Sequence, residues 1–293
     1  MKTKLYLALF CVAFFWGTTF LAIRIGVETI PPFILAGIRN LISGSIIFLF
    51  LLFQKKLEPI SLRQFGRAFL LAILMIVLAN GLTTFSEKYI TSGLASLIST
   101  LSPFFVLVLN LVLGNEKLSI KTTLGIALGM LGIFLIYQNS LTDLLNPNYR
   151  TGVFALLLAV LSWAIGTIIT KKGSTNSLSM LMNVSLQMLI AGVVLTASQF
   201  YFTHEISTVN WSLNSILSMV YLAIFGSVVG YVAYNYLISQ MPSTKVSVLS
   251  YVNLVVALFL GWLILDEIIT ARILVAATLI ICGVVIVNYK KAK

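Results

Sequence analysis

Polar and aromatic side chains interrupt several long apolar stretches of this sequence, and their types suit the non-covalent binding of a small solute. An indole ring offers an apolar wall together with one N–H donor. Amides and hydroxyls offer oriented hydrogen bonds, and each needs a partner when its surroundings are apolar. The side chains with this potential are Trp16, Asn80, Ser99, Ser102, Trp163, Tyr231, Tyr251 and Asn253. Together they predict a binding site for a solute with both apolar and polar parts.

Arg39 is the one charged residue well inside an apolar stretch. It would lie about 12 Å along a helix that starts at Pro31. A charge buried in this way is costly and is usually functional. The alternatives are snorkelling toward the outer interface or bonding to carbonyls as structural support. We therefore assign Arg39 a structural or gating role, with solute binding as the alternative.

The sequence lacks the residue sets that catalysis or metal binding would need. No His, Cys, Asp and Glu set has metal-ligand spacing, and no nucleophile has an obvious base. A phosphate-binding glycine loop is missing, so ATP-driven pumping is unsupported. Acids that could relay protons at mid-membrane are also missing, although Glu87 could act from the rim of a span. We expect neither an enzyme nor a bound cofactor.

The composition indicates which environment must hold these side chains. Of the 293 residues, 59% are hydrophobic and 9% charged, whereas soluble domains average about 45–50% and about 25%. Disordered chains are polar and charged, and two cysteines, Cys11 and Cys282, cannot form a disulfide-rich scaffold. The net charge of +11 comes from basic residues between apolar runs, which does not indicate nucleic-acid binding. The chain is therefore predicted to be integral to a lipid bilayer.

Charged residues divide the chain into apolar stretches of about 20 residues, the length that a helix needs to cross a bilayer. Strand-like alternation of polar and apolar residues is absent, which argues against a membrane barrel. We predict an all-α integral membrane protein with ten transmembrane helices. Their approximate spans are 4–24, 31–53, 67–86, 91–113, 119–138, 151–170, 177–201, 215–238, 243–265 and 271–289.

Lysine and arginine set the expected orientation of these helices. With the N-terminus inside, the cytoplasmic segments hold 14 of these residues and the outer segments hold four. The even number of helices then places both termini in the cytoplasm. The first apolar stretch has no small-residue cleavage site after it, so we expect a retained span in the cell (inner) membrane.

The two halves of the sequence resemble each other. A shift of 151 residues places Ser92, Ser96, Ser99 and Glu116 on Ser243, Ser247, Ser250 and Glu267, and a shift of 147 places Trp16 on Trp163. Pro103 has no counterpart, because Leu254 takes its place. Five helices per half is an odd number, so the second half must enter the membrane upside down, as in many secondary transporters. We divide the chain into a first repeat at 1–138, a linker at 139–150 and a second repeat at 151–293.

The segment FFWGTTFLAIRIGVETIPPFILAG at 14–37, followed by Ile38 and Arg39, resembles the opening of EamA-like proteins of the drug/metabolite transporter superfamily. The stretch 92–132 is similar as well, with a Ser/Ala-rich helix, Pro103, Glu116 and a glycine-rich helix. The resemblance covers essentially the whole chain. It implies ten helices, two inverted five-helix repeats, and the export or uptake of small metabolites.

Three further residues are candidates for structural or gating roles. Pro103 removes a backbone hydrogen bond and can kink the fourth helix. Glu116 and Glu267 end the fourth and ninth helices on opposite membrane faces, where they would cap hairpins or form gate contacts. For the aromatic and polar side chains, helix packing and interhelical hydrogen bonding are the alternatives to solute contact.

These observations predict a secondary transporter, specifically an exporter of amino acids or related amphipathic solutes, working by alternating access at a cavity between the repeats. A non-transporting receptor or scaffold is the alternative. A membrane-embedded enzyme is a third hypothesis, and it would need acids or histidines near the interface. The expected partners are a small-molecule solute and the lipid bilayer, with no nucleic acid, and a homodimer is left open.

Overall fold

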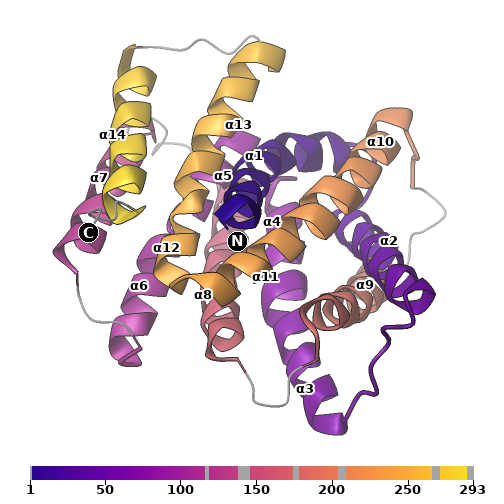
Figure 1. The fold of residues 1–293 in the computed structure, drawn as a ribbon. Helices are drawn as coiled ribbons and strands as arrows, with labels where there is room; N and C mark the ends of the chain where they lie inside the picture. The colour runs from indigo at the N-terminus through magenta and orange to yellow at the C-terminus, as the bar shows by residue number, and fades with distance from the viewer. Residues whose placement is uncertain are drawn as a thin grey trace.

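The computed structural model describes residues 2–115, 119–137, 146–173, 178–203, 209–265 and 271–288, and within these ranges its regular structure is entirely helical (Figure 1). The helices of the first half are α1 (Lys2–Gly26), α2 (Pro32–Phe53), α3 (Leu62–Leu71), η1 (Ala72–Gly81), α4 (Leu82–Ser86), α5 (Ser92–Ser99), α6 (Ser102–Val112) and α7 (Ile120–Tyr137). Those of the second half are α8 (Pro147–Lys172), α9 (Met180–Thr203), α10 (Leu213–Tyr221), η3 (Leu222–Val229), α11 (Gly230–Gln240), α12 (Ser243–Ser247), α13 (Leu249–Leu265) and α14 (Ala271–Asn288).

Within the described ranges, eight segments are long and apolar enough to cross a membrane. Four of them correspond to α1, α2, α8 and α9. The other four join consecutive helices, at Leu62–Ser86, Ser92–Val112, Leu213–Gln240 and Ser243–Leu260. Two shorter apolar helices, α7 and α14, complete the predicted order of ten. The prediction of an all-helical membrane protein is confirmed.

Several spans begin earlier than the hydropathy of the sequence predicts, because polar residues at their starts form helix caps. The third begins at Leu62 instead of 67, behind Ser61, which forms a capping box. The eighth begins at Leu213 instead of 215, behind the N-cap Ser212. The sixth begins at Pro147 instead of 151. Hydropathy marks where a helix enters the apolar core, and the cap marks where the helix starts.

The equivalent helices α2 and α9 of the two halves cross in close, reciprocal contact. Gly44 of α2 packs against Leu189 of α9, and Gly192 of α9 packs against Leu41 of α2. A Cβ atom would lie 2.8 Å from Leu189 Cγ at Gly44 and 2.7 Å from Leu41 Cγ at Gly192, so neither position has room for a side chain. From Leu41 to Gly44 along α2, the partners run backwards from Gly192 to Leu189. The two helices are therefore antiparallel.

The equivalent helices α7 and α14 repeat this arrangement, and they stand side by side at the left of Figure 1. Gly132 of α7 lies against the carbonyl of Ala276 on α14, and Gly283 of α14 lies against the carbonyl of Gly125 on α7. These contacts are again reciprocal and antiparallel. Such packing of equivalent helices is what a two-fold relation between two inverted halves produces.

Four spans depart from the regular α-helix within their length, and they form two pairs of equivalent spans. The third and eighth contain the π-helical stretches η1 and η3, a form found frequently at functional sites. The fourth is interrupted between α5 and α6, and Pro103 lies in the first turn of α6. The ninth is interrupted between α12 and α13. Irregular backbone at membrane depth is tolerated where protein encloses it or where it lines a cavity. We therefore expect a cavity between these segments.

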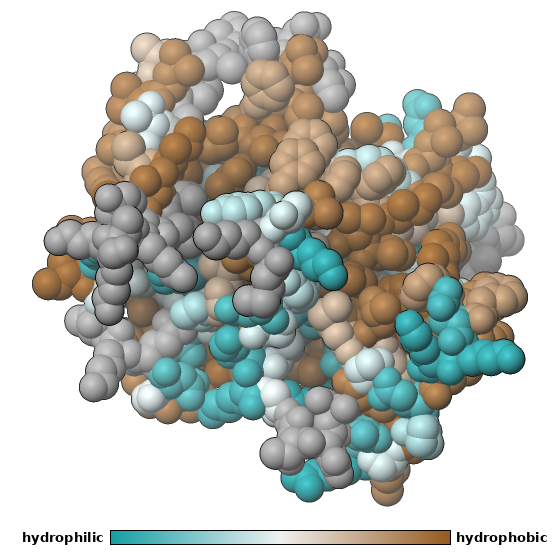
Figure 2. All heavy atoms as spheres, in the orientation of Figure 1, coloured by the Kyte–Doolittle hydropathy of each residue, from teal (hydrophilic) through white to brown (hydrophobic). Residues whose placement is uncertain are grey.

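Large hydrophobic side chains cover much of the visible surface, whereas hydrophilic residues gather toward the lower part of the view (Figure 2). Phe53, Ile120 and Phe154 have exposed fractions of 76–81%. A soluble monomer rarely exposes apolar area on this scale. In a bilayer the same side chains face lipid, which accounts for their position.

Candidate solute-binding site

A cavity of about 150 Å³ lies between the two halves. Its lining comes from the first four spans and from the sixth, eighth and ninth, so both halves contribute. Six of the eight side chains predicted to bind solute line it, namely Trp16, Asn80, Ser99, Ser102, Trp163 and Asn253. Sequence reasoning did not select Thr19, Thr83, Tyr234, Ser247 and Ser250, which also line it. The polar and aromatic groups of distant segments therefore meet at one place.

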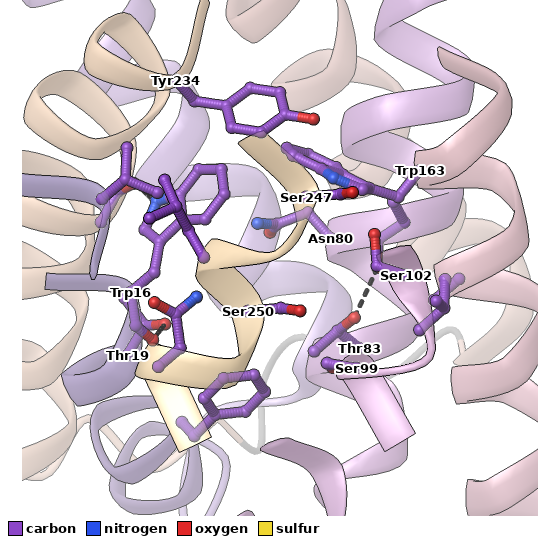
Figure 3. A pocket seen from close by; sticks show the side chains of 18 of the residues that line it. Trp16, Thr19, Asn80, Thr83, Ser99, Ser102, Trp163, Tyr234, Ser247 and Ser250 are labelled. Atoms are coloured by element: carbon purple, nitrogen blue, oxygen red, sulfur yellow. Dashed lines mark hydrogen bonds between the residues drawn. The ribbon is translucent and has the colours of Figure 1, made fainter. Parts of the chain in front are cut away.

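Three aromatic side chains form one wall of the cavity, which we call the aromatic wall (Figure 3). The ring centroids of Trp16 and Trp163 lie 5.3 Å apart edge to face, and that of Tyr234 lies 5.0 Å from Trp16 and 4.7 Å from Trp163. Trp16 Nε1 donates to the carbonyl of Gly226 in η3 at 3.0 Å, and the Tyr234 hydroxyl bonds to that of Thr167 at 2.5 Å. These bonds fix the rings of Trp16 and Tyr234, and both are made to residues of the second half.

Tyr231 and Tyr234 lie one turn apart on α11, and they have different surroundings. Tyr231, which the sequence favoured, is not among the described residues that line the cavity. Its hydroxyl donates to Gln187 Oε1 at 2.7 Å, and its ring lies 6.1 Å from that of Trp163. The spacing of three residues places both tyrosines near the same neighbours. It does not tell which of the two meets open space, and this is why Tyr234 was missed.

Arg39 lines the cavity from α2, and it is the one charged side chain among the described residues that do so. It is 2% exposed. Its Nη2 donates to Oδ1 of Asn80 in η1, whereas Nε and Nη1 have no hydrogen-bond partner in the described part of the chain. Glu87 follows α4, and it is fully buried and acts electrostatically on Arg39. Its carboxyl oxygens have no hydrogen-bond partner among the described residues, so the Glu87 carboxyl and the Arg39 guanidinium are buried without a hydrogen bond between them.

Serines from the two interrupted spans also line the cavity, at Ser99, Ser102, Ser247 and Ser250. Ser99 and Ser250 are repeat equivalents, yet their hydroxyls differ. Ser99 Oγ donates to the carbonyl of Ala95 at 2.8 Å, whereas the buried Ser250 Oγ has no partner within the described ranges. The shift of 151 residues had already aligned Ser250 with Ser99, so the internal repeat was the signal that could have found it.

Asn253 and Tyr251 lie close together on α13 but point to different neighbours. Asn253 lines the cavity, and with its amide nitrogen turned toward α1 it donates to the carbonyls of Val12 at 3.2 Å and Ala13 at 3.0 Å. Tyr251 is fully buried and donates to the carbonyl of Ile126 in α7 at 3.4 Å. Tyr251 is not among the described lining residues, and it joins α13 to α7. Asn253 therefore supports the α1–α13 contact as well as facing the cavity.

The remaining predicted residues are structural or gating candidates. Pro103 lies in the first turn of α6 beside the cavity-lining Ser102, where its missing N–H costs little. Glu116 and Glu267 lie outside the described residues, so their roles as hairpin caps or gate contacts stay predictions.

The groups around the cavity suit reversible binding. They comprise flat aromatic faces, amides, hydroxyls and one guanidinium. In the part of the chain that the structure describes, no cluster of three or more His, Cys, Asp or Glu could hold a metal ion. This lining can orient a small amphipathic molecule and release it again, as a membrane carrier requires.

Comparison with known proteins defines the family of this carrier-like fold. The sequence profile of the EamA-like transporter family matches residues 3–138 and 150–289, one copy in each half. The chain belongs to the EamA-like transporter family, which is a family of transporters and not of enzymes. The resemblance that the residues at 14–39 and 92–132 indicated is therefore confirmed.

Individual relatives match along nearly the whole chain. The uncharacterized inner membrane transporter YedA of Escherichia coli (strain K12) is 34% identical over 286 residues, which cover 92% of this chain and 90% of YedA. The uncharacterized transporter YoaV of Bacillus subtilis (strain 168) is 27% identical over 281 residues, covering 96% of this chain and 95% of YoaV. A solved structure titled only "Crystal structure of protein" has a TM-score of 0.79 over 97% of both chains. Its identity of 16% shows a shared fold alone.

Proposed function

We propose that the protein is a secondary transporter that moves a small amphipathic metabolite through the central cavity by alternating access. The observation that carries the proposal is the shared lining of one cavity by both halves, with aromatic rings and polar groups together. Transporters built from inverted repeats bind their solutes at the interface of the repeats, where discontinuous helices meet. The interrupted fourth and ninth spans meet that description.

In this proposal the apolar part of the solute lies on the aromatic wall, and its polar part bonds to amides and hydroxyls such as those of Asn80 and Ser250. The reciprocal α2–α9 and α7–α14 contacts relate the two halves by an approximate two-fold axis. In a frame with that symmetry the two halves can exchange conformations. The two resulting states open the same cavity to opposite sides of the membrane. The solute class we propose is amino acids and related compounds. The direction is export, driven by the gradient of the solute or by exchange.

Location and topology are part of the same proposal. The relative YedA is described as an inner membrane transporter, which supports the cell (inner) membrane as the location of this chain. The excess of Lys and Arg in alternate loops supports cytoplasmic termini. Labelling of single cysteines placed in the loops from either side of the membrane tests the topology. Cross-linking in native membranes tests whether two copies associate as a homodimer.

The experiment that tests the transport function compares metabolites inside and outside cells that express the wild-type protein or Trp163→Ala at equal membrane levels. We expect a class of compounds to accumulate outside with the wild-type protein, and this accumulation to fall with the variant because the aromatic wall loses its central ring. Trp211→Ala is the matched control, since Trp211 is 45% exposed and lies outside the cavity.

The other outcomes distinguish the remaining hypotheses. Depletion of a compound from the medium would make the protein an importer. Equal export by wild type and Trp163→Ala would support the transport function but would show that the solute binds elsewhere in the protein. If no compound responds to either protein, the non-transporting receptor or scaffold becomes the better explanation.

A further inference from the structure

A hydrogen bond joins the second and third spans in both halves, but only the first half builds it with a charged side chain. In the first half, Arg39 Nη2 donates to Asn80 Oδ1. In the second half, the Tyr231 hydroxyl donates to Gln187 Oε1 at 2.7 Å. The neutral pair makes the same interhelical link, so the scaffold does not require a charge at this place.

Two structural markers establish that these pairs are equivalent. Arg39 and Gln187 each lie two residues before the leucine that contacts the glycine of the opposite helix. Asn80 and Tyr231 each lie 19 residues after the serine that caps their span. The two pairs therefore occupy corresponding positions in the two repeats.

Glu87 also adds a charge that the scaffold does not need. Its carbonyl accepts a hydrogen bond from Arg24 Nη1 at 2.6 Å. The equivalent carbonyl in the second half, that of Ile238, accepts one from Lys171 Nζ at 2.9 Å. The shared contact uses only the backbone of residue 87 or 238. The first half thus carries a buried carboxylate and a buried guanidinium where the second half has isoleucine and glutamine.

The charges beside the cavity leave one positive charge without a partner. Arg24 and Arg39 both act electrostatically on Glu87. Two guanidinium groups share a single carboxyl group, so at least one positive charge is left over. Arg39 Nε and Nη1 are buried and unpaired. An anionic group that accepts hydrogen bonds from the guanidinium would satisfy these donors and balance the charge. A carboxylate matches the end of a guanidinium in shape. One of its oxygens can accept from Nη1, and the other can accept from the hydrogen of Nη2 that does not bond to Asn80.

We propose that Arg39 binds the carboxylate of the transported solute, so that the substrates are amphipathic carboxylates, zwitterionic amino acids included, and not amines or neutral sugars. Asn80 holds the guanidinium at the cavity, and it lies among the aromatic side chains in Figure 3. The apolar part of the solute then lies on the aromatic wall. The solute is that of the proposed transport function, on which this inference rests.

Thermal unfolding of the purified wild-type protein in detergent gives the first test. The probes are L-leucine and L-phenylalanine, their N-acetyl derivatives and their C-terminal amides. We expect the acids to raise the melting temperature and the amides, which lack the carboxylate, to leave it unchanged. Equal responses to acids and amides, or no response to any acid, would overturn the proposal.

Arg39→Gln is the critical variant, because glutamine stands at the equivalent position of the other half and can still donate to Asn80. It should remain folded and bind the acids about 10- to 100-fold more weakly, as the loss of a hydrogen bond to a charged group predicts. Arg39→Lys keeps the charge without the planar fork, so its affinity should lie between those of wild type and Arg39→Gln. Unchanged affinity of Arg39→Gln for the acids would also overturn the proposal.

The double variant Arg39→Gln/Glu87→Gln separates solute binding from charge balance. If Arg39 served only to neutralise Glu87, removal of both charges would restore the response to the acids. If Arg39 holds the solute carboxylate, the double variant stays unresponsive although it is folded. Recovery in the double variant would therefore contradict the inference.

Export measurements distinguish failure of this inference from failure of the transport function. Among compounds whose export depends on Trp163, we expect carboxylates, and we expect Arg39→Gln to lose them. Normal export by Arg39→Gln of a compound without a carboxylate would overturn the inference and leave transport standing. If the wild type exports no compound at all, the transport function fails, and the binding panel decides the role of Arg39 by itself.

Discussion

The two halves of the molecule share a scaffold and differ in the chemistry that they place on it. Each has a π-helical third span, an interrupted fourth span and a basic side chain bound to a carbonyl near the end of that third span. The first half adds the buried charges of Arg39 and Glu87. The second half adds Tyr234 to the aromatic wall and leaves the Ser250 hydroxyl unpaired. Residues that are alike in the two halves thus build the shared scaffold. Residues that differ between equivalent positions determine the charge and polarity of the cavity.

This division has a physical reason. A frame that opens alternately to two sides is well served by two halves that pack alike, because each arrangement then has a counterpart of similar energy. A small metabolite has no such symmetry, since one part of it is apolar and another is polar. The cavity must therefore be asymmetric even where the frame is symmetric. Differences between equivalent residues are the natural place to look for solute recognition.

Gln187→Arg should give the largest effect, because it copies the charge of the first half into the second without its surroundings. Gln187 is fully buried, and the residue equivalent to Glu87 is Ile238, which cannot balance the new charge. An uncompensated buried charge costs about 3–5 kcal/mol. We expect a strong loss of folded protein, measured as the monodisperse fraction and melting temperature in size-exclusion chromatography.

Adding Ile238→Glu to Gln187→Arg sharpens the comparison. If Glu87 compensates Arg39 in the first half, the copied pair should recover part of the lost melting temperature. Gln187→Leu is the control for the lost amide, and it should cost less because leucine buries no charge. A Gln187→Arg protein as stable as wild type would show that this position tolerates a charge, and the contrast between the halves would lose its meaning.

The number and order of the helices, and their division into two halves, were predictable because they follow from hydropathy and from the internal repeat. Ten apolar stretches and matched serines sufficed for the helices and the two halves. The caps at Ser61 and Ser212 were missed because they lie outside the apolar runs. The π-helical stretches η1 and η3 left no mark in composition, since they have the same apolar residues as an α-helix.

The site was predictable as a set of residue types but not as a surface. Mid-span polar groups such as Asn80 do meet at the cavity, because an apolar span gives a polar side chain few other places to go. Tyr251 breaks that rule by reaching the carbonyl of Ile126. Whether a buried hydroxyl meets a cavity or a carbonyl depends on how each packed helix is rotated about its own axis, by less than one turn. A single sequence does not determine that rotation.

Gly44→Val and Gly192→Val test the symmetric frame, and their effects should be of intermediate size. Each new side chain would collide with a leucine and with backbone of the opposite helix, at 3.0 Å for Leu189 N and 2.9 Å for Leu41 N. Overpacking of this kind costs about 1–3 kcal/mol. Because the contacts are reciprocal, we expect the two variants to lower the melting temperature by similar amounts.

Gly66→Val is the matched control for both variants, since a Cβ at Gly66 meets nothing within 4 Å. It should leave the melting temperature unchanged or raise it, because glycine is the poorer helix former. A large loss at one of Gly44 and Gly192 with none at the other would argue against an equivalent role for α2 and α9.

Ser250→Ala and Ser99→Ala compare equivalent hydroxyls at the cavity, and the difference between them should be the smallest effect. Ser99 Oγ already donates to the carbonyl of Ala95 at 2.8 Å, so its removal changes little that a solute contacts. Ser250 Oγ has no partner among the described residues, so a solute can bond to it. The loss of one such bond should weaken binding about 2- to 10-fold in Ser250→Ala. Titrations with the compound exported by the wild type measure both affinities, and similar melting temperatures of the two variants would show that folding is not the cause.

Equal losses of affinity in the two variants would mean that the two equivalent hydroxyls contribute equally to solute binding. Solute recognition would then depend on the charge of Arg39 and on the aromatic wall, without a contribution from the open hydroxyl of the second half.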